Sequence, residues 1–104
     1  MRIIDVHTHP IFFGSGAKRP EVARLVARSR ALGIVRMVSL GDVLFHGAHP
    51  TAAQVAELND DNARVQSWHP DFFSSFCMLN PVLGERAVMK EVERCVTKYG
   101  FKGI

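Results

Sequence analysis

Strand-like apolar runs alternate with helical patterns along this sequence, and the alternation constrains the fold more than any other feature. The apolar runs predict strands at residues 2–7, 34–40, 73–79 and 101–104. The helical patterns, in which apolar side chains recur about every three to four residues, lie at residues 20–32, 51–68 and 84–99. Strands separated by helices are typical of a parallel sheet. The sequence therefore predicts an α/β fold with three βα units and the start of a fourth strand.

The fourth predicted strand begins only at residue 101, which bears on how the domain is completed. Strands of a parallel sheet are covered on both faces and paired on both edges, whereas three and a half βα units leave open edges. We therefore expect residues 1–104 to form one partial domain, the N-terminal portion of a longer protein that is truncated on its C-terminal side. The alternative is that several copies complete one another as a homo-oligomer.

Composition places the chain among globular proteins. It has 104 residues, 47% of them hydrophobic, and no run reaches the roughly 18 apolar residues of a membrane span. The N-terminus lacks a secretory signal pattern, so we expect a cytoplasmic protein without a membrane partner. The net charge of +3 is scattered, which argues against nucleic-acid binding. Cys77 and Cys95 lie in apolar patterns without CxxC spacing, and we expect both to be reduced thiols in the core.

Two histidines close the first predicted strand, and they are the strongest functional signal. Side chains alternate between the faces of a strand, so His7 and His9 project to one face and can converge on a metal ion. In βα folds, ligands bind at the carboxyl ends of the strands, where this pair lies. We therefore expect His7 and His9 to be ligands of a divalent metal, with zinc as the first candidate. A catalytic zinc site has three protein ligands, so at least one more is needed.

Asp5 lies two positions before His7 and would share the face of the histidine pair, deeper in the sheet. A carboxylate that faces inward needs a partner. Asp5 is therefore a candidate to orient a histidine or to pair with a basic group of another strand, with a purely structural hydrogen bond as the alternative. We do not expect it to be a metal ligand.

The position of each remaining polar candidate, before or after a predicted strand, indicates at which end of the sheet it lies. His46 and His49 follow the second predicted strand, at the same end of the sheet as the histidine pair, so they are candidates to line the pocket. A solvated loop is the alternative for both. Asn80, after the third predicted strand, is a candidate to contact substrate, or else a turn former before a proline. His69 precedes that strand, and we expect it at the opposite end of the sheet.

Three segments resemble one known group of enzymes. Residues 4–10, IDVHTHP, look like the first-strand signature of the amidohydrolase superfamily. Residues 69–81, which begin HPDFF and end LNP, and residues 99–104, YGFKGI, are similar to its amidohydrolase-related branch. The HxH motif alone also opens polymerase-and-histidinol-phosphatase phosphoesterases and TatD-type nucleases. The two later segments favour the amidohydrolase-related branch.

The resemblance implies a (β/α)₈ TIM barrel, of which 104 residues form less than half, because such a barrel has about 250 residues. It implies that His7 and His9 hold a divalent metal, commonly zinc, in an enzyme that hydrolyses a C–N or C–O bond of a small-molecule substrate. Non-oxidative decarboxylation of aromatic or unsaturated carboxylic acids, as in some members of the group, is the alternative reaction. The other ligands and the acid–base residues would come from later strands, so no catalytic residue is assigned. A third alternative is that the chain is an inert fragment or an assembly module.

Overall fold

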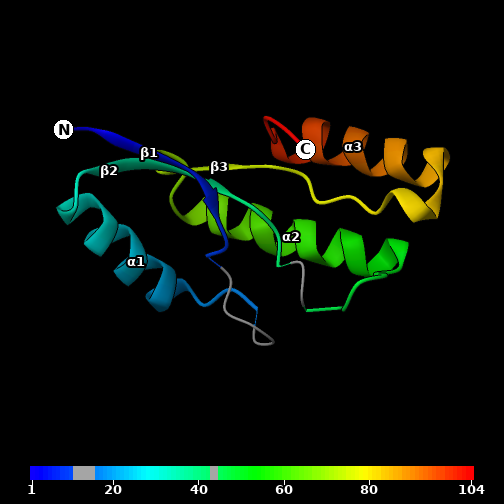
Figure 1. The fold of residues 1–104 in the computed structure, drawn as a ribbon, viewed down its shortest axis with the longest axis horizontal. Helices are drawn as coiled ribbons and strands as arrows, with labels where there is room; N and C mark the ends of the chain where they lie inside the picture. Colours follow the sequence, from blue (N-terminus) through cyan, green and yellow to red (C-terminus); the bar gives the residue numbers. More distant parts are fainter. Residues whose placement is uncertain (11–15, 43–44) are drawn as a thin grey trace.

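The computed structural model describes residues 1–10, 16–42 and 45–104. Its three strands, β1 (Ile3–Thr8), β2 (Ile34–Ser39) and β3 (Phe73–Ser75), form one parallel sheet in the order β1-β2-β3. The helices are α1 (Arg19–Ala31), α2 (Ala52–Trp68) and α3 (Glu85–Tyr99), with a short 3-10 helix η1 (Pro81–Leu83) before α3 (Figure 1). The predicted α/β architecture, three parallel βα units in an open sheet, is therefore confirmed.

The main hydrophobic core lies between the sheet and the first two helices, which share one side of it in Figure 1. Val22 of α1, Met37 of β2, Val65 of α2 and Phe73 of β3 are buried there, together with Phe72. Burial of these side chains supplies the main driving force for docking the helices, because stabilisation grows with the apolar area removed from water.

Local sequence signals set most of the helix boundaries. Thr51 and Gln54 form a capping box at the start of α2, in which each side chain bonds the other's backbone N–H. Gly100 ends α3 in the left-handed conformation, with a φ of 66°, which glycine adopts without steric cost. No helix in the described ranges is long and apolar enough to cross a membrane.

The prediction of a third strand over residues 73–79 is wrong at its carboxyl end, because β3 stops at Ser75. Beyond it, amide side chains of α2 bond the backbone in addition to neighbouring backbone segments. Asn59 Oδ1 accepts a hydrogen bond from Met78 N at 2.8 Å, and Asn59 Nδ2 donates to Met78 O at 2.9 Å. Asn62 Nδ2 donates to Phe76 O at 3.1 Å. The chain stays extended after β3 because α2 satisfies its polar groups.

Asn62 is fully buried and links α2 to two strands of the sheet. Its Nδ2 also donates to the carbonyl of Ser39, at the carboxyl end of β2, at 3.0 Å, and its Oδ1 accepts from the hydroxyl of Ser39. Burying an amide costs little free energy when all of its polar atoms are hydrogen-bonded. A buried polar group that has lost its partner lowers the stability of the fold. Asn62 therefore holds the carboxyl ends of β2 and β3 in place.

The two cysteines meet in a second, smaller core. Cys77 and Cys95 are free and buried, and the Cys77 Sγ donates to the Cys95 Sγ at a separation of 3.1 Å. Burial raises the pKa of both thiols, so both stay protonated at neutral pH. This contact fastens α3 to the segment that follows β3. Phe101 completes the cluster, and beside it Phe76 and Gly103 form a single parallel bridge.

Replacing Asn62 tests whether the buried amide holds the strand ends. We expect Asn62→Ala to lower the free energy of unfolding by about 1–3 kcal/mol, because it leaves the carbonyls of Ser39 and Phe76 buried without this donor. Urea denaturation followed by circular dichroism measures the change. Ser67→Ala is the matched control, since Ser67 is exposed on the same helix and bonds only the carbonyl of Arg64. A loss no larger than that of the control would contradict the assigned role.

Candidate metal site

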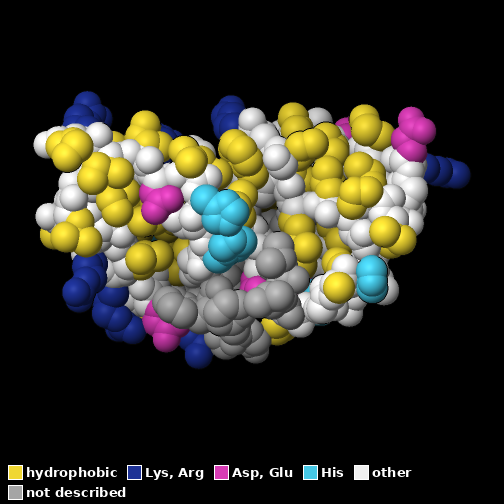
Figure 2. All heavy atoms as spheres, in the orientation of Figure 1, with side chains coloured by type: hydrophobic (Ala, Val, Ile, Leu, Met, Phe, Trp, Pro, Cys, Tyr) yellow, Lys and Arg dark blue, Asp and Glu magenta, His cyan; other side chains and the backbone are white. Residues whose placement is uncertain are grey.

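The histidine pair lies at the carboxyl end of β1, on an edge of the described sheet. Thr8, the last residue of β1, pairs with Ser39 of β2, and its carbonyl accepts a hydrogen bond from Leu40 N at 2.8 Å. His7 therefore lies within the strand and His9 immediately after it. Both side chains are exposed, and Figure 2 shows histidine side chains next to each other on the surface.

The two imidazoles converge at their Nε2 atoms. His7 Nε2 and His9 Nε2 are 3.2 Å apart, and the rings meet edge to face with centroids 5.1 Å apart. The Nδ1 of His9 lies 3.0 Å from the carbonyl oxygen of Gly41, in the segment after β2. Because a carbonyl only accepts, His9 Nδ1 carries the proton, and the Nε2 of the neutral ring keeps its lone pair.

This geometry fits a shared metal ion. Two nitrogens that each lie about 2.0–2.1 Å from a tetrahedral zinc ion are about 3.3 Å from each other. The observed separation of 3.2 Å is close to that value. A backbone carbonyl on the second ring nitrogen is also the usual way in which a metal-binding histidine is oriented. The described ranges contain no group of three or more candidate ligands, so this site offers two.

Gly41 is the residue of this site that the sequence analysis did not identify. Its contribution is a backbone carbonyl, and backbone groups carry no residue-type signal. The available clue is its position, directly after β2 at the end of the sheet where ligands bind. The contact joins the edge strand β1 to the segment after β2, so the orientation of the His9 ring depends on both strands.

Asp5 interacts within its own strand. Its Oδ1 accepts a hydrogen bond from the backbone N of His7 at 3.1 Å, and the side chain is half-buried. This bond lies directly beside the histidine pair, because His7 is one of its two members. In the described part of the chain, Asp5 has no ion pair with a basic residue of another strand.

The other candidate residues of the sequence analysis contact groups other than His7 and His9. The Nε2 of His46 is 3.1 Å from the carboxylate of Glu57 on α2, and its ring packs against Phe45. His49 is exposed. Asn80 accepts from Val82 N at 3.2 Å, which caps η1, and donates to the carbonyl of Pro50 at 2.9 Å. His69 caps the end of α2, before β3 and so at the amino end of that strand.

The protonation of His9 can be measured directly. We expect the Nδ1–H tautomer of His9 at neutral pH, because the Gly41 carbonyl stabilises a proton on Nδ1. Long-range nitrogen–proton correlation NMR distinguishes the two tautomers, and exposed His49 serves as the internal reference without this contact. A predominant Nε2–H tautomer of His9 would contradict the assigned geometry.

Comparison with solved structures identifies the fold. A candidate amidohydrolase from Staphylococcus aureus matches with a TM-score of 0.77 and 19% identity, over 99% of this chain and 36% of its own length. A 2,6-dihydroxybenzoate decarboxylase from Rhizobium matches with a TM-score of 0.72 and 22% identity, over 98% of this chain and 37% of its own. No protein-family model matches the chain, and no curated relative was found.

A third solved structure carries a metal. It is a dihydroxybenzoic acid decarboxylase from Polaromonas with bound manganese and the inhibitor 2-nitroresorcinol, similar over 77% of this chain and 25% of its own length, with a TM-score of 0.65 and 27% identity. The chain thus spans little more than a third of the first two structures and a quarter of the third. The resemblance found in the sequence is confirmed at the level of the fold: the chain has part of an amidohydrolase TIM-barrel fold.

Proposed function

We propose that this chain supplies two metal ligands, His7 and His9, to a metal-dependent hydrolase with the amidohydrolase fold. The observation that carries the proposal is the convergence of the two Nε2 atoms, 3.2 Å apart, at the carboxyl end of β1. In barrels of this type the functional site is built at that end of the strands. The Gly41 carbonyl supports the same role, since it leaves the His9 Nε2 free to bind a metal.

Zinc is the first candidate for the divalent metal, because imidazole nitrogens suit it and the ligand separation fits it. Manganese is the second, because the Polaromonas decarboxylase binds it. When bound, such an ion lowers the pKa of a water molecule towards about 7 and polarises a substrate carbonyl. The histidines themselves act as ligands and not as bases, and Gly41 fixes the ring of His9 for that task.

Two reactions compete within this proposal. Hydrolysis of a C–N or C–O bond in a small-molecule substrate is the first candidate, and the likeness to the Staphylococcus aureus protein supports it. Non-oxidative decarboxylation of an aromatic carboxylic acid is the second, and the likeness to the Rhizobium and Polaromonas decarboxylases favours it. The metal ligands on β1 serve either reaction, so specificity depends on other parts of the site.

We further propose that residues 1–104 act as part of a larger barrel. The apolar side chains of Ile4 and Val6 on β1 are 60% and 70% exposed, which is unusual for a strand of a parallel sheet. A complete catalytic zinc site also needs a third protein ligand. The isolated chain is therefore expected to be inactive, as the fragment interpretation holds, while the complete barrel is the enzyme.

Metal titration tests the ligand assignment on the chain itself. Zn²⁺ is expected to bind weakly, at one ion per chain, and to shift the ring signals of His7 and His9 in NMR spectra. His7→Ala combined with His9→Ala removes the binding. His49→Ala combined with His69→Ala is the matched control and keeps it. Acidification releases the ion, because a protonated imidazole has no lone pair to donate. Unchanged binding by the His7 and His9 variant would refute the site.

The reaction is tested on the complete barrel. Cleavage of an amide or lactone substrate without release of CO₂ indicates hydrolysis. Release of CO₂ from an aromatic carboxylic acid indicates decarboxylation. In either case, His7→Ala with His9→Ala is expected to lower the rate by at least about 100-fold, since loss of an outer-shell partner alone costs about 10- to 100-fold. Full activity of that variant would exclude a metal-dependent mechanism at this site.

A further inference from the structure

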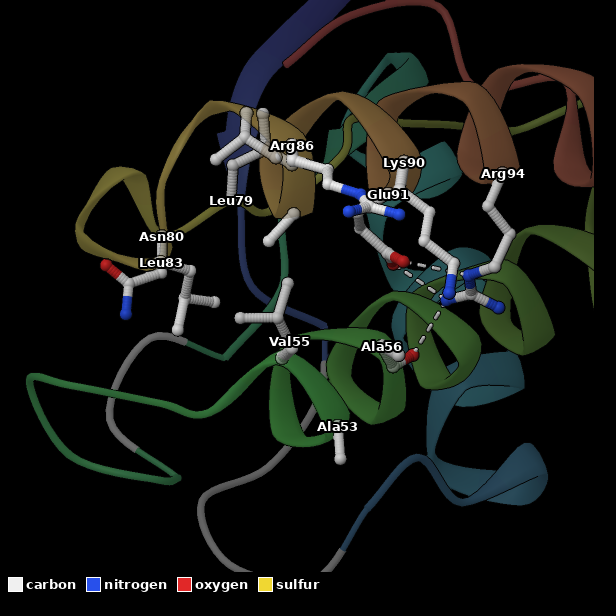
Figure 3. Close-up of a pocket in the computed structure, with 13 residues that line it drawn as sticks. Ala53, Val55, Ala56, Leu79, Asn80, Leu83, Arg86, Lys90, Glu91 and Arg94 are labelled. Atoms are coloured by element: carbon white, nitrogen blue, oxygen red, sulfur yellow. Dashed lines mark hydrogen bonds and ion pairs between the residues drawn. The ribbon is translucent and has the colours of Figure 1, made fainter.

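A groove runs between α2 and α3, away from the histidine pair. Its walls are residues 52–56 at the start of α2 and residues 86–94 of α3, and Leu79, Asn80 and Leu83 close one end (Figure 3). Its volume is about 610 Å³, which falls in the range of about 300–1,000 Å³ that small-molecule sites occupy. None of the five histidines lines it.

The base of the groove is apolar. Val55 of α2 lies near Leu83 in Figure 3, and Leu79, Ala56 and Ala87 also line the groove. The alanines on the two helices leave space that larger side chains would fill. The apolar part of a ligand that binds in the groove would therefore be removed from water.

Basic side chains line the α3 wall on successive turns. Arg86, Lys90 and Arg94 are spaced four residues apart and so lie along one face of the helix (Figure 3). The positive charge of Arg94 is already paired within the chain. Its guanidinium lies 2.7 Å from the carboxylate of Glu91 and 2.6 Å from that of Asp60. Burial alone would raise the pKa of Glu91, but hydrogen bonds from Arg94 and Asn59 hold it below its usual value, so Glu91 stays charged.

Arg86 and Lys90 differ from Arg94 in that both are exposed and neither forms an ion pair within the described ranges. The groove wall thus keeps two positive charges that have no ion-pair partner within the described ranges, directly beside an apolar base. An anion that also carries an apolar body complements both features. Inorganic phosphate would leave the base uncovered, and a neutral hydrocarbon would leave the charges unpaired.

We infer that this groove binds an organic monocarboxylate with an apolar body, for which octanoate serves as the probe. The carboxylate lies between Arg86 and Lys90, and the body lies on Val55, Leu79 and Leu83. The inference does not rest on the proposed metal site, because the two share no residue. Both walls are helices, which form the outer ring of a TIM barrel, so the groove remains on the outer surface of the complete fold.

Ligand titrations followed by backbone NMR test the inference on the 104-residue chain. Octanoate is expected to shift the amide signals of Ala53, Leu83 and Ala87 in a saturable way. Acetate, which lacks the body, and octanol, which lacks the charge, are expected to bind more weakly than octanoate. Octanoate-induced shifts that are confined to the amide signals of β1, or an affinity for acetate equal to that for octanoate, would overturn the assignment.

Charge-neutralising variants distinguish specific binding of octanoate in the groove from a general effect of the net charge of the chain. Arg86→Gln with Lys90→Gln is expected to weaken octanoate binding by about 3- to 10-fold, as expected for two solvent-exposed ion pairs, and to leave octanol binding unchanged. Arg24→Gln with Arg28→Gln is the matched control, because these exposed arginines have the same spacing on α1. An equal loss in the control, or no loss in the groove variant, would overturn the inference.

Discussion

The buried amides of Asn59 and Asn62 are the interaction on which the rest of this structure depends. They bond the backbone beyond β3 and the carboxyl end of β2 at once. Buried polar groups of this kind fix a unique arrangement when every partner is present. From Asn62 the constraint passes to Ser39, then two residues along to Gly41, whose carbonyl orients the ring of His9.

The histidine pair combines a local constraint with a distant one. The projection of both side chains to one face follows from the two-residue repeat of a strand, and needs nothing outside β1. The orientation of the His9 ring needs the segment after β2. β1 is also the strand with the least cover, as the exposure of Ile4 and Val6 shows. The site is thus defined internally by short-range geometry but remains open towards solvent on the side where further ligands would enter.

The sequence predicted features that depend on local periodicity and missed those that depend on pairing across the chain. Alternating strand and helix patterns predicted the three βα units, including a third helix that ends at residue 99. The third strand was predicted too long, because an apolar run does not reveal that α2 supplies side-chain amides to bond it. Arg94 of α3 is bonded to Asp60, 34 residues away. No spacing rule predicts such a contact.

Helix α2 lines the proposed groove, and its buried amides also bond the strand ends near the histidine pair. Asn59 and Asn62 point towards the strands, while Ala53 and Ala56 line the groove on another face of the same helix. Asn59 Nδ2 also donates to Glu91 at 2.8 Å, and Glu91 in turn holds Arg94, so one network positions α3 against α2. The rotation of α2 about its axis is therefore fixed by bonds to the sheet. The shape of the groove accordingly depends on Asn59, and the orientation of His9 depends on Asn62, three residues along the same helix.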